Sequence, residues 1–287
     1  GLSLSQRQWM QVRKSIEGDN DSYFDRDGMH DEIATWQFPL HFIDFETCRP
    51  VIPFHAGSRP SSLIAFQFSH HVMNADGTVE HAHEFLCTSR QENPNPSFVD
   101  ALYKAVGDTG TIVHYAAHEI STLRAINWQL QKHQKTKWNR DALIPFMDSI
   151  APRGNQSASR SVVDLCQLVK RFYYAPSTRG SNSIKAVLPA ILNESKYLKD
   201  RYSRPMYGAI DGIPSKNFQN MSWYTAVNGT VQDPYSLLPT ISATDADDSE
   251  PKHCIALRNG SAAMQAYADL QYQDWTEQRT QETKLAL

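Results

Sequence analysis

Hydrophobic and polar residues alternate along residues 39–47, which read Pro-Leu-His-Phe-Ile-Asp-Phe-Glu-Thr. Side chains two positions apart in a β-strand lie on the same face of the sheet. The run therefore predicts a strand that places Asp44 and Glu46 together on one face, beside Leu40 and Phe42. Two carboxylates are thus expected as neighbours on a surface that is otherwise apolar.

Two further strands are predicted before the first core helix. Residues 63–69 form an apolar run, and residues 78–86 follow it after the hairpin signal Asn-Ala-Asp-Gly at 74–77. We expect these three strands to form an antiparallel meander. A helix from Ser97 to Gly107, opened by a variant of the capping box, then leads to a buried strand at 110–115.

The second half of the pattern completes a sheet. A helix after the fourth strand carries Ile120, Leu123 and Ile126 at helical spacing, and residues 162–166 read as a fifth strand. The order of three strands, a helix, a strand, a helix and a strand predicts an α/β fold of the ribonuclease H-like type. This is a mixed five-stranded sheet flanked by helices, in which the fourth strand lies beside the first after a crossover helix.

The chain divides into a polar lead segment, residues 1–38, and a ribonuclease H-like domain, residues 39–287. A short helix opening at Ser3 is expected in the lead segment. Residues 199–259 are rich in Pro, Gly and polar residues, with an acidic patch at 245–250, and predict a long irregular insertion at the surface. A final helix is expected from about Ser261 to the C-terminus.

Charge and cysteine content narrow the classes of protein. The net charge of −3 excludes a globally basic nucleic-acid binder, although a local basic patch such as the run from Lys132 to Arg140 remains compatible with it. Four cysteines with no C-x-x-C pair argue against a disulfide framework and a cysteine zinc site. Reduced thiols and a cytoplasmic location are therefore expected. No apolar run approaches the ~18 residues of a membrane span, so no membrane partner is expected.

Asp44 and Glu46 are the first candidates for chemistry. Like charges this close repel one another, and burying either without a partner is costly. A bound divalent cation is the simplest remedy, and carboxylate oxygens suit Mg²⁺ or Mn²⁺. The alternative is a pair of solvated acids at a fraying strand end, because D-x-E alone is a weak signal.

Glu119 is the second carboxylate element. It lies in the first turn of the helix after the fourth strand, where an acid can simply complement the helix dipole. Because the fourth strand is expected beside the first, its end would also bring Glu119 toward Asp44 and Glu46. Three acids that converge at strand ends form a plausible two-metal site for phosphoryl transfer.

Several motifs resemble one family. In chain order they are D-F-E-T at 44–47, F-Q-F-S at 66–69, V-D-L at 163–165, G-S-N-S-I-K-A-V-L-P at 180–189 and N-G-S-A-A at 259–263. Together they resemble a bacterial domain-of-unknown-function family assigned to the DEDD, or DnaQ-like, 3′–5′ exonucleases, over roughly residues 35–287. Family members often carry a preceding RecB-like nuclease region with an iron–sulfur cysteine cluster, a possible partner region.

The resemblance implies that Asp44 and Glu46 are catalytic metal ligands of a two-metal site with Mg²⁺ or Mn²⁺. Glu119 stands where the superfamily usually has an Asp, and Asp164 is a further candidate ligand that more often has a structural role. Neither His114 nor its neighbour at 118 falls at the usual place of the general base, so both are assigned local structural roles.

The resemblance also requires a last Asp on a C-terminal helix. The sequence reaches Leu287 without it, so we expect the C-terminal motif to be truncated and this chain to be inactive if no other acid replaces that residue. Asp269 and Asp274 are the only upstream substitutes.

Candidates for nucleic-acid contact surround the G-S-N-S-I-K stretch. Its polar residues can cap a helix, and a helix N-terminus with a nearby lysine is a ready phosphate site. An ordinary capped core helix is the alternative. The candidate residues are Ser181, Ser183, Lys185, Gln67 and Arg179.

Two functions follow as expectations. The first is a metal-dependent nuclease domain, a 3′–5′ exonuclease that hydrolyses DNA phosphodiesters, with an endonuclease or a ribonuclease as weaker variants. The second is a non-catalytic nucleic-acid-binding or scaffold module of the same fold within a larger nuclease.

Overall fold

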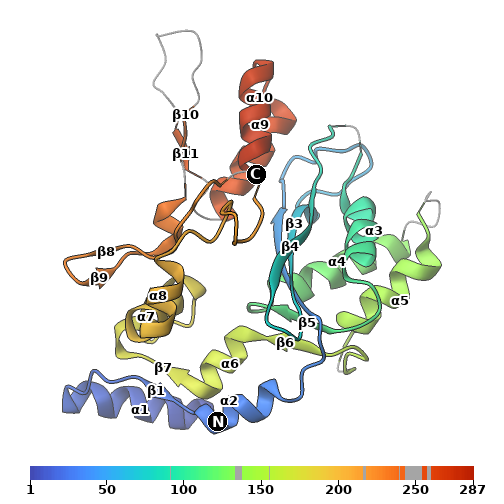
Figure 1. Cartoon of the computed structure of the whole chain (residues 1–287). Coiled ribbons are helices and arrows are strands. Elements are labelled where there is room, and N and C mark those ends of the chain that lie inside the picture. Colours follow the sequence, from blue (N-terminus) through green and yellow to red (C-terminus); the bar gives the residue numbers. More distant parts are fainter. Residues whose placement is uncertain are drawn as a thin grey trace.

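The structure is a computed structural model of the whole chain (Figure 1). The residues that it describes are 1–90, 92–132, 138–154, 156–215, 218–238, 240–242, 254–256 and 260–287. Part of the predicted basic run, residues 133–137, and the predicted acidic patch at 245–250 lie outside the described residues.

A five-stranded mixed sheet forms the centre of the molecule, and its strands follow one another in the order β4-β3-β2-β5-β6. The antiparallel pairs are β2 with β3 and β3 with β4, whereas β5 runs parallel to both β2 and β6. This arrangement confirms the predicted meander and the predicted ribonuclease H-like α/β fold. The strands are β2 (Leu40–Cys48), β3 (Ile64–Met73), β4 (Val79–Leu86), β5 (Thr111–His114) and β6 (Val162–Asp164).

The turn between β3 and β4 forms as its sequence predicts. Gly77 has a φ of 82°, a left-handed conformation that glycine adopts without steric cost, and its N–H donates to the carbonyl of Asn74. On the other side of β3, the pairing with β2 shifts at a β-bulge between Glu46 and Thr47. The bulge lies directly after the acid pair, where such irregularities re-aim side chains.

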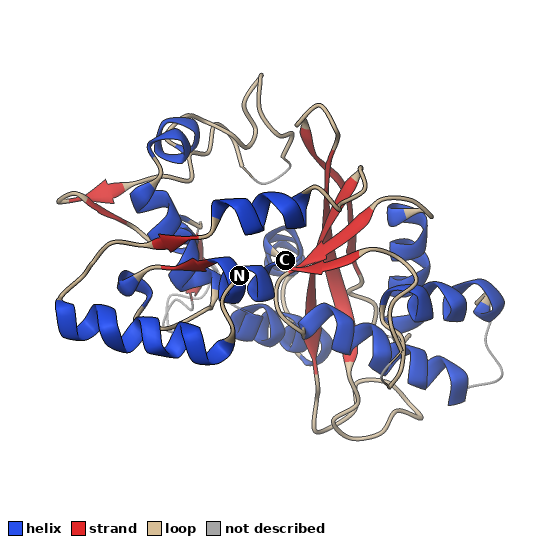
Figure 2. Ribbon diagram, turned by 90° about the horizontal axis from the view of Figure 1, so that it is seen from below, coloured by secondary structure: helices blue, strands red, loops and turns tan. Residues whose placement is uncertain are grey.

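Three helices cover one face of the sheet (Figures 1 and 2): α3 (Asn95–Val106), α4 (His118–Lys132) and α5 (Arg140–Ile150). The main hydrophobic core lies beneath them and includes fully buried Phe98 and Leu102. The predicted end of α3 at Gly107 is confirmed, but the capping box is wrong. The helix begins earlier, after Pro94, and the Ser97 hydroxyl donates to the Pro94 carbonyl.

The opposite face packs against the C-terminal helices, α9 (Gly260–Tyr272) and α10 (Glu277–Ala286). Phe66 stacks on Tyr267 with ring centroids 4.1 Å apart. The prediction of one continuous final helix is wrong, because the chain leaves helical geometry after Tyr272. Thr276 then caps a new helix by accepting a hydrogen bond from the Arg279 N–H.

The lead segment, residues 1–38, packs against the elements that directly follow β6. Its elements are α1 (Leu4–Glu17), β1 (Tyr23–Phe24) and α2 (Arg26–Ile33), and they contact α6 (Leu165–Phe172) and β7 (Tyr173–Tyr174). The predicted cap at Ser3 is confirmed as a full capping box with Gln6. The buried Arg7 guanidinium donates to the Tyr173 carbonyl and to Asn182 Oδ1, so α1 is tied to the segment before α7.

The fifth strand is shorter than predicted. Asp164 ends it because its carboxylate accepts a hydrogen bond from the Cys166 N–H and thereby caps α6. Leu165 and Cys166 are therefore helical rather than extended.

The region after β7 consists mostly of short elements, and the predicted insertion, residues 199–259, begins within α8. Its elements are η1 (Pro176–Thr178), α7 (Ile184–Glu194), α8 (Lys196–Tyr202), β8 (Ala226–Val227), β9 (Thr230–Val231), η2 (Pro234–Leu237), β10 (Thr240–Ser242) and β11 (Cys254–Ala256). The hairpin of β8 and β9 contacts α7 through β9. In the part of the chain that the structure describes, no helix is both long enough and apolar enough to cross a membrane.

Candidate active site

The acid pair lies where the strand alternation predicts it. Asp44 pairs with Ser69 and Glu46 with Gln67 across β3, so both carboxylates project from the same face of the sheet. Phe45, between them, is 2% exposed and packs into the opposite core. The aromatic core residue therefore fixes the register that presents the two acids.

Glu119 reaches the same site from α4. The helix begins just after β5, and β5 runs parallel to β2, so the two strand ends meet at one edge of the sheet. The Glu119 side chain is buried, and its Oε2 lies 3.6 Å from Nδ1 of buried His114. Neither of these two atoms has a hydrogen-bond partner. Buried polar atoms left without partners are costly and are frequent at functional sites.

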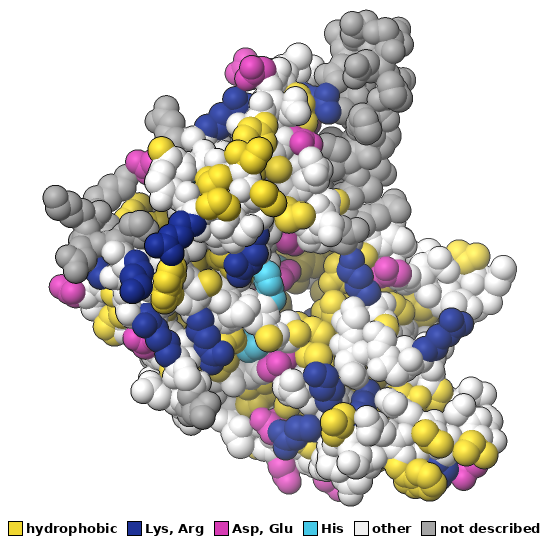
Figure 3. All heavy atoms as spheres, turned by 180° about the vertical axis from the view of Figure 1, so that it is seen from behind, with side chains coloured by type: hydrophobic (Ala, Val, Ile, Leu, Met, Phe, Trp, Pro, Cys, Tyr) yellow, Lys and Arg dark blue, Asp and Glu magenta, His cyan; other side chains and the backbone are white. Residues whose placement is uncertain are grey.

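These residues line one cleft with a volume of about 670 Å³. A space-filling view from behind shows a hollow beside acidic and histidine side chains, with Lys and Arg side chains on both sides of it (Figure 3). The polar lining consists of Asp44, Glu46, Thr47, His114, Tyr115, His118, Glu119, Tyr235 and Ser261. The apolar lining includes Phe42, Val113, Leu165, Ile184 and Met264.

Burial and neighbouring carboxylates raise the pKa of Asp44 and of Glu46. Desolvation by the cleft walls and the charge of Glu119 raise the pKa of Asp44, although its side chain stays accessible from the cleft. Desolvation, together with Asp44 and Glu119, raises the pKa of Glu46 to about 7, against a smaller opposing effect of Lys185. Both shifts arise first from removing the carboxylates from water and then from the other acids nearby, so the ionised forms are destabilised in the cleft.

His118 also belongs to this site, although a local structural role was predicted for it from the sequence. It lines the cleft and lowers the pKa of Asp44, while its Nε2 lies 3.5 Å from Thr47 Oγ1. His114, expected to be structural as well, lines the cleft beside Glu119. Their positions at the end of β5 and the start of α4 were the available signal.

Two residues from distant segments complete the cleft, and the sequence did not single them out as site residues. Tyr235 comes from the insertion, and burial and the charges of Asp44 and Glu46 raise its pKa. Gly260 begins α9, where a Cβ would lie 3.1 Å from Glu46 Oε2. The absence of a side chain at Gly260 lets the helix backbone approach the carboxylate closely. A helix N-terminus next to an acid is electrostatically favourable.

Other predicted site residues lie outside the cleft lining. One oxygen of Asp164 accepts hydrogen bonds from the main-chain N–H groups of Ala116 and Cys166, which is a structural role. The Gln67 side chain donates to the carbonyl of Leu287.

The G-S-N-S-I-K stretch reaches the cleft at its end. Ser183 occupies the N-cap position of α7 but makes no side-chain cap bond, and Ser181 Oγ accepts from the Ser183 N–H. Ile184 lines the cleft, and exposed Arg179 ends η1 with a φ of 50°. Of the five predicted nucleic-acid contacts, Lys185 is the one whose charge acts on the acid pair.

The two candidate replacements for the missing last Asp lie outside the cleft lining. Asp274 forms an ion pair with Arg90, and partly exposed Asp269 accepts a hydrogen bond from Gln265. Neither lines the cleft.

The acids of the cleft suit a hard divalent cation, because their carboxylate oxygens are the ligands that such a cation prefers and Glu119 Oε2 has no hydrogen-bond partner. Among the described residues, however, no group of three or more His, Cys, Asp or Glu side chains is arranged to hold a metal ion. Mg²⁺ commonly takes one or two protein carboxylates and completes its shell with water and substrate phosphate oxygens. The arrangement fits that mode and not an all-protein cage.

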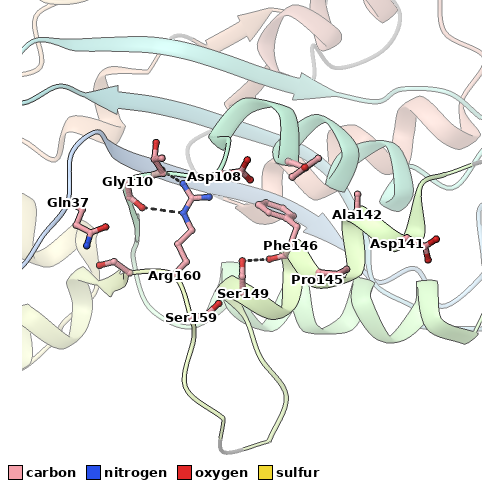
Figure 4. A pocket seen from close by; sticks show the side chains of 13 residues that line it. Gln37, Asp108, Gly110, Asp141, Ala142, Pro145, Phe146, Ser149, Ser159 and Arg160 are labelled. Carbon is pink, nitrogen blue, oxygen red and sulfur yellow. Dashed lines mark hydrogen bonds between the residues drawn. The ribbon is translucent and has the colours of Figure 1, made fainter.

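A second cavity of about 650 Å³ lies at another place, between α3, α5 and the loop before β6 (Figure 4). Its conspicuous cation, Arg160, donates hydrogen bonds to the main-chain carbonyls of Val106, Gly107, Thr109 and Gly110. The guanidinium therefore ties loops together and has little capacity left for a ligand.

Comparison with known proteins agrees with part of the sequence interpretation. A family model described as "Domain of unknown function (DUF2779)" matches residues 41–183, a segment that includes the three cleft acids. No curated protein and no solved structure matches the chain.

Proposed function

We propose that this chain is a metal-dependent nuclease domain that hydrolyses DNA phosphodiester bonds from the 3′ end. The observation that carries the proposal is the convergence of Asp44, Glu46 and Glu119 in one cleft at the ends of parallel strands. DNA as substrate and the 3′–5′ direction rest on the motif resemblance alone.

In this proposal Asp44 and Glu46 hold the cation, and Glu119 completes the charge of the site. Bound Mg²⁺ or Mn²⁺ would supply an activated water and stabilise the leaving oxygen. The chain's own contribution is positioning and charge: β2 presents Asp44 and Glu46, the start of α4 presents Glu119, and apolar side chains line the cleft around them. Exposed His118 also lines the cleft, and its charge opposes the rise in the pKa of Asp44.

The test is hydrolysis of an internally labelled and a 3′-labelled single strand in Mn²⁺. It is run with this chain and with the longest natural chain that contains it. We expect shortening from the 3′ end, and a loss of at least about 100-fold with Asp44→Asn. Glu80→Gln, an exposed acid on β4 of the same sheet, is the matched control and should behave like the wild type. Hydrolysis that Asp44→Asn leaves unchanged would contradict the mechanism.

A non-catalytic binding module is the second candidate. The finding in its favour is that the described acids and histidines form no group of three that could hold a metal ion. This alternative predicts that the protein binds an oligonucleotide but does not cleave it, whichever metal ion is added. Cleavage at internal positions, or of RNA in place of DNA, would instead assign an endonuclease or a ribonuclease of the same fold.

A further inference from the structure

Among the described residues of the insertion, Tyr235 is the aromatic side chain that lines the cleft. It lies in η2, where the Asp233 carboxylate accepts a hydrogen bond from the Tyr235 N–H at 3.0 Å and fixes the turn. The ring is partly exposed in the cleft, and the charges of Asp44 and Glu46 act on its hydroxyl. A long surface insertion is therefore anchored so that an aromatic ring stands beside the acid pair.

Lys185 approaches the same ring from α7. Its Nζ lies 4.8 Å from the centroid of the Tyr235 ring, which is a cation–π distance. The charge of Lys185 also acts on Glu46. The two residues come from separate segments, and they place an aromatic surface and a cation at one point of the cleft.

The framework around this pair is rigid. Asn182, just before α7, accepts a hydrogen bond from Arg7 at its side chain and another from the Tyr115 hydroxyl at its carbonyl. On the other side, buried Val231 of β9 packs near α7, and η2 follows three residues later. Both partners are thus held by contacts that do not involve the acids, as a preformed binding element requires.

We propose that Lys185 and Tyr235 form a clamp for one unstacked nucleotide at the end of a single strand. Lys185 contacts a non-bridging phosphate oxygen, and the Tyr235 ring packs against the sugar or base of the same nucleotide. The clamp adds a substrate-binding element to the proposed function. It rests on that function for the identity of the bond that is cleaved. Its binding role stands independently of cleavage.

The chemistry of the cleft favours this ligand. The lining contains carboxylates, which suit a cation with its phosphate, and it also contains the Tyr235 ring, Ile184 and Met264, which offer apolar surface to a base. Aromatic side chains bind unstacked bases of any sequence, and a single cation adds affinity through counterion release. The end of a double strand would have to unpair and unstack before one of its nucleotides could enter the cleft.

The test measures binding without cleavage. A short single-stranded oligonucleotide with a 5′ fluorophore is titrated with the Asp44→Asn protein, and anisotropy is recorded at several salt concentrations. We expect Tyr235→Ala to weaken binding by about 5- to 150-fold and Tyr235→Phe to stay near the parent protein. Lys185→Gln should weaken binding and lower the salt slope by about 1. Tyr235→Leu retains most of the volume and replaces the alanine variant if that one does not fold.

Matched controls are Tyr197→Ala, an exposed tyrosine of α8 outside the cleft lining, and Lys104→Gln on α3, across the sheet. The clamp is overturned if Tyr235→Ala and Lys185→Gln bind like these controls, or if the parent protein binds no oligonucleotide. Weakened binding without any wild-type hydrolysis leaves the clamp standing and contradicts the nuclease proposal. Normal hydrolysis with unchanged binding of both variants contradicts the clamp alone.

Discussion

The two faces of the sheet carry polar side chains of opposite character. On the face with the core helices, His41, His70 and His83 form a row across β2, β3 and β4. On the other face Asp44 and Glu46 stand in the cleft. The histidines satisfy one another, whereas the acids repel one another. The comparison separates a polar network that stabilises the fold from one that is available to a ligand.

The histidine row is a closed hydrogen-bond chain. His41 Nε2 lies 3.0 Å from the Thr109 carbonyl, His41 Nδ1 lies 2.9 Å from His70 Nε2, and His70 Nδ1 lies 3.2 Å from His83 Nδ1. Because the carbonyl only accepts, each neutral ring donates toward it: His83 to His70, His70 to His41 and His41 to Thr109. Burial and the neighbouring histidines lower the pKa of His70 to about 3, so the central ring of the row stays neutral.

The acids have no comparable closure. Their pKa values are raised, and the buried Glu119 oxygen has no hydrogen-bond partner. Unsatisfied charge of this kind costs stability and is retained where a ligand will compensate it. The same sheet therefore carries a hydrogen-bonded polar network on one face and, on the other, the acid pair that we propose as a binding site.

The largest expected effect comes from breaking the closed network. His70→Ala removes a fully buried ring and leaves nitrogen atoms of His41 and His83 without partners. We expect a loss of about 2–4 kcal/mol in the free energy of unfolding, measured by chemical denaturation. His30→Ala, at an exposed position of α2, is the control and should change little. A His70 variant as stable as that control would mean that the row contributes nothing to stability.

The two faces should also respond to pH with opposite signs. His70 has a lowered pKa, so its contribution is present above about 6.5 and is lost as the pH falls toward 3. Glu46 has a pKa raised from 4.5 to about 7, so the folded state loses stability as the pH rises through that window. Glu46→Gln should therefore gain about 1–3 kcal/mol relative to the wild type above pH 7, and nothing below pH 4.5.

Thermal melting of the wild type and Glu46→Gln between pH 4 and 8 measures this difference, with Glu80→Gln as the control. If the difference in melting temperature between these two proteins is the same at every pH, ionisation of Glu46 does not destabilise the folded state, which would contradict the prediction.

The smallest effect is expected at Gly260. Alanine there places a Cβ 3.1 Å from Glu46 Oε2, so the carboxylate must move by a few tenths of an ångström. Helix propensity favours alanine by up to ~1 kcal/mol, which offsets part of the crowding. We expect an almost unchanged melting temperature and Mn²⁺ binding weakened a few-fold by calorimetry. A large loss of stability with intact binding would place the role of Gly260 in packing alone.

The sequence predicted the part of this site that follows from periodicity. The alternation of β2 fixed the shared face of Asp44 and Glu46, and the strand order brought Glu119 beside them. Tyr235 carried no such signal, because its place depends on how β9 packs on α7. The break before Thr276 and the helical start at Leu165 were missed because side-chain caps overrode apolar runs.

The most direct test of the central claim is calorimetric titration of the protein with Mn²⁺ at pH 8, which is above the raised pKa of Glu46, about 7. We predict saturable binding to the wild type and to Glu80→Gln, and a loss of at least tenfold in affinity for Asp44→Asn and Glu46→Gln. Binding that these two substitutions leave unchanged, or no binding to the wild type, would contradict the account of the cleft as a cation site.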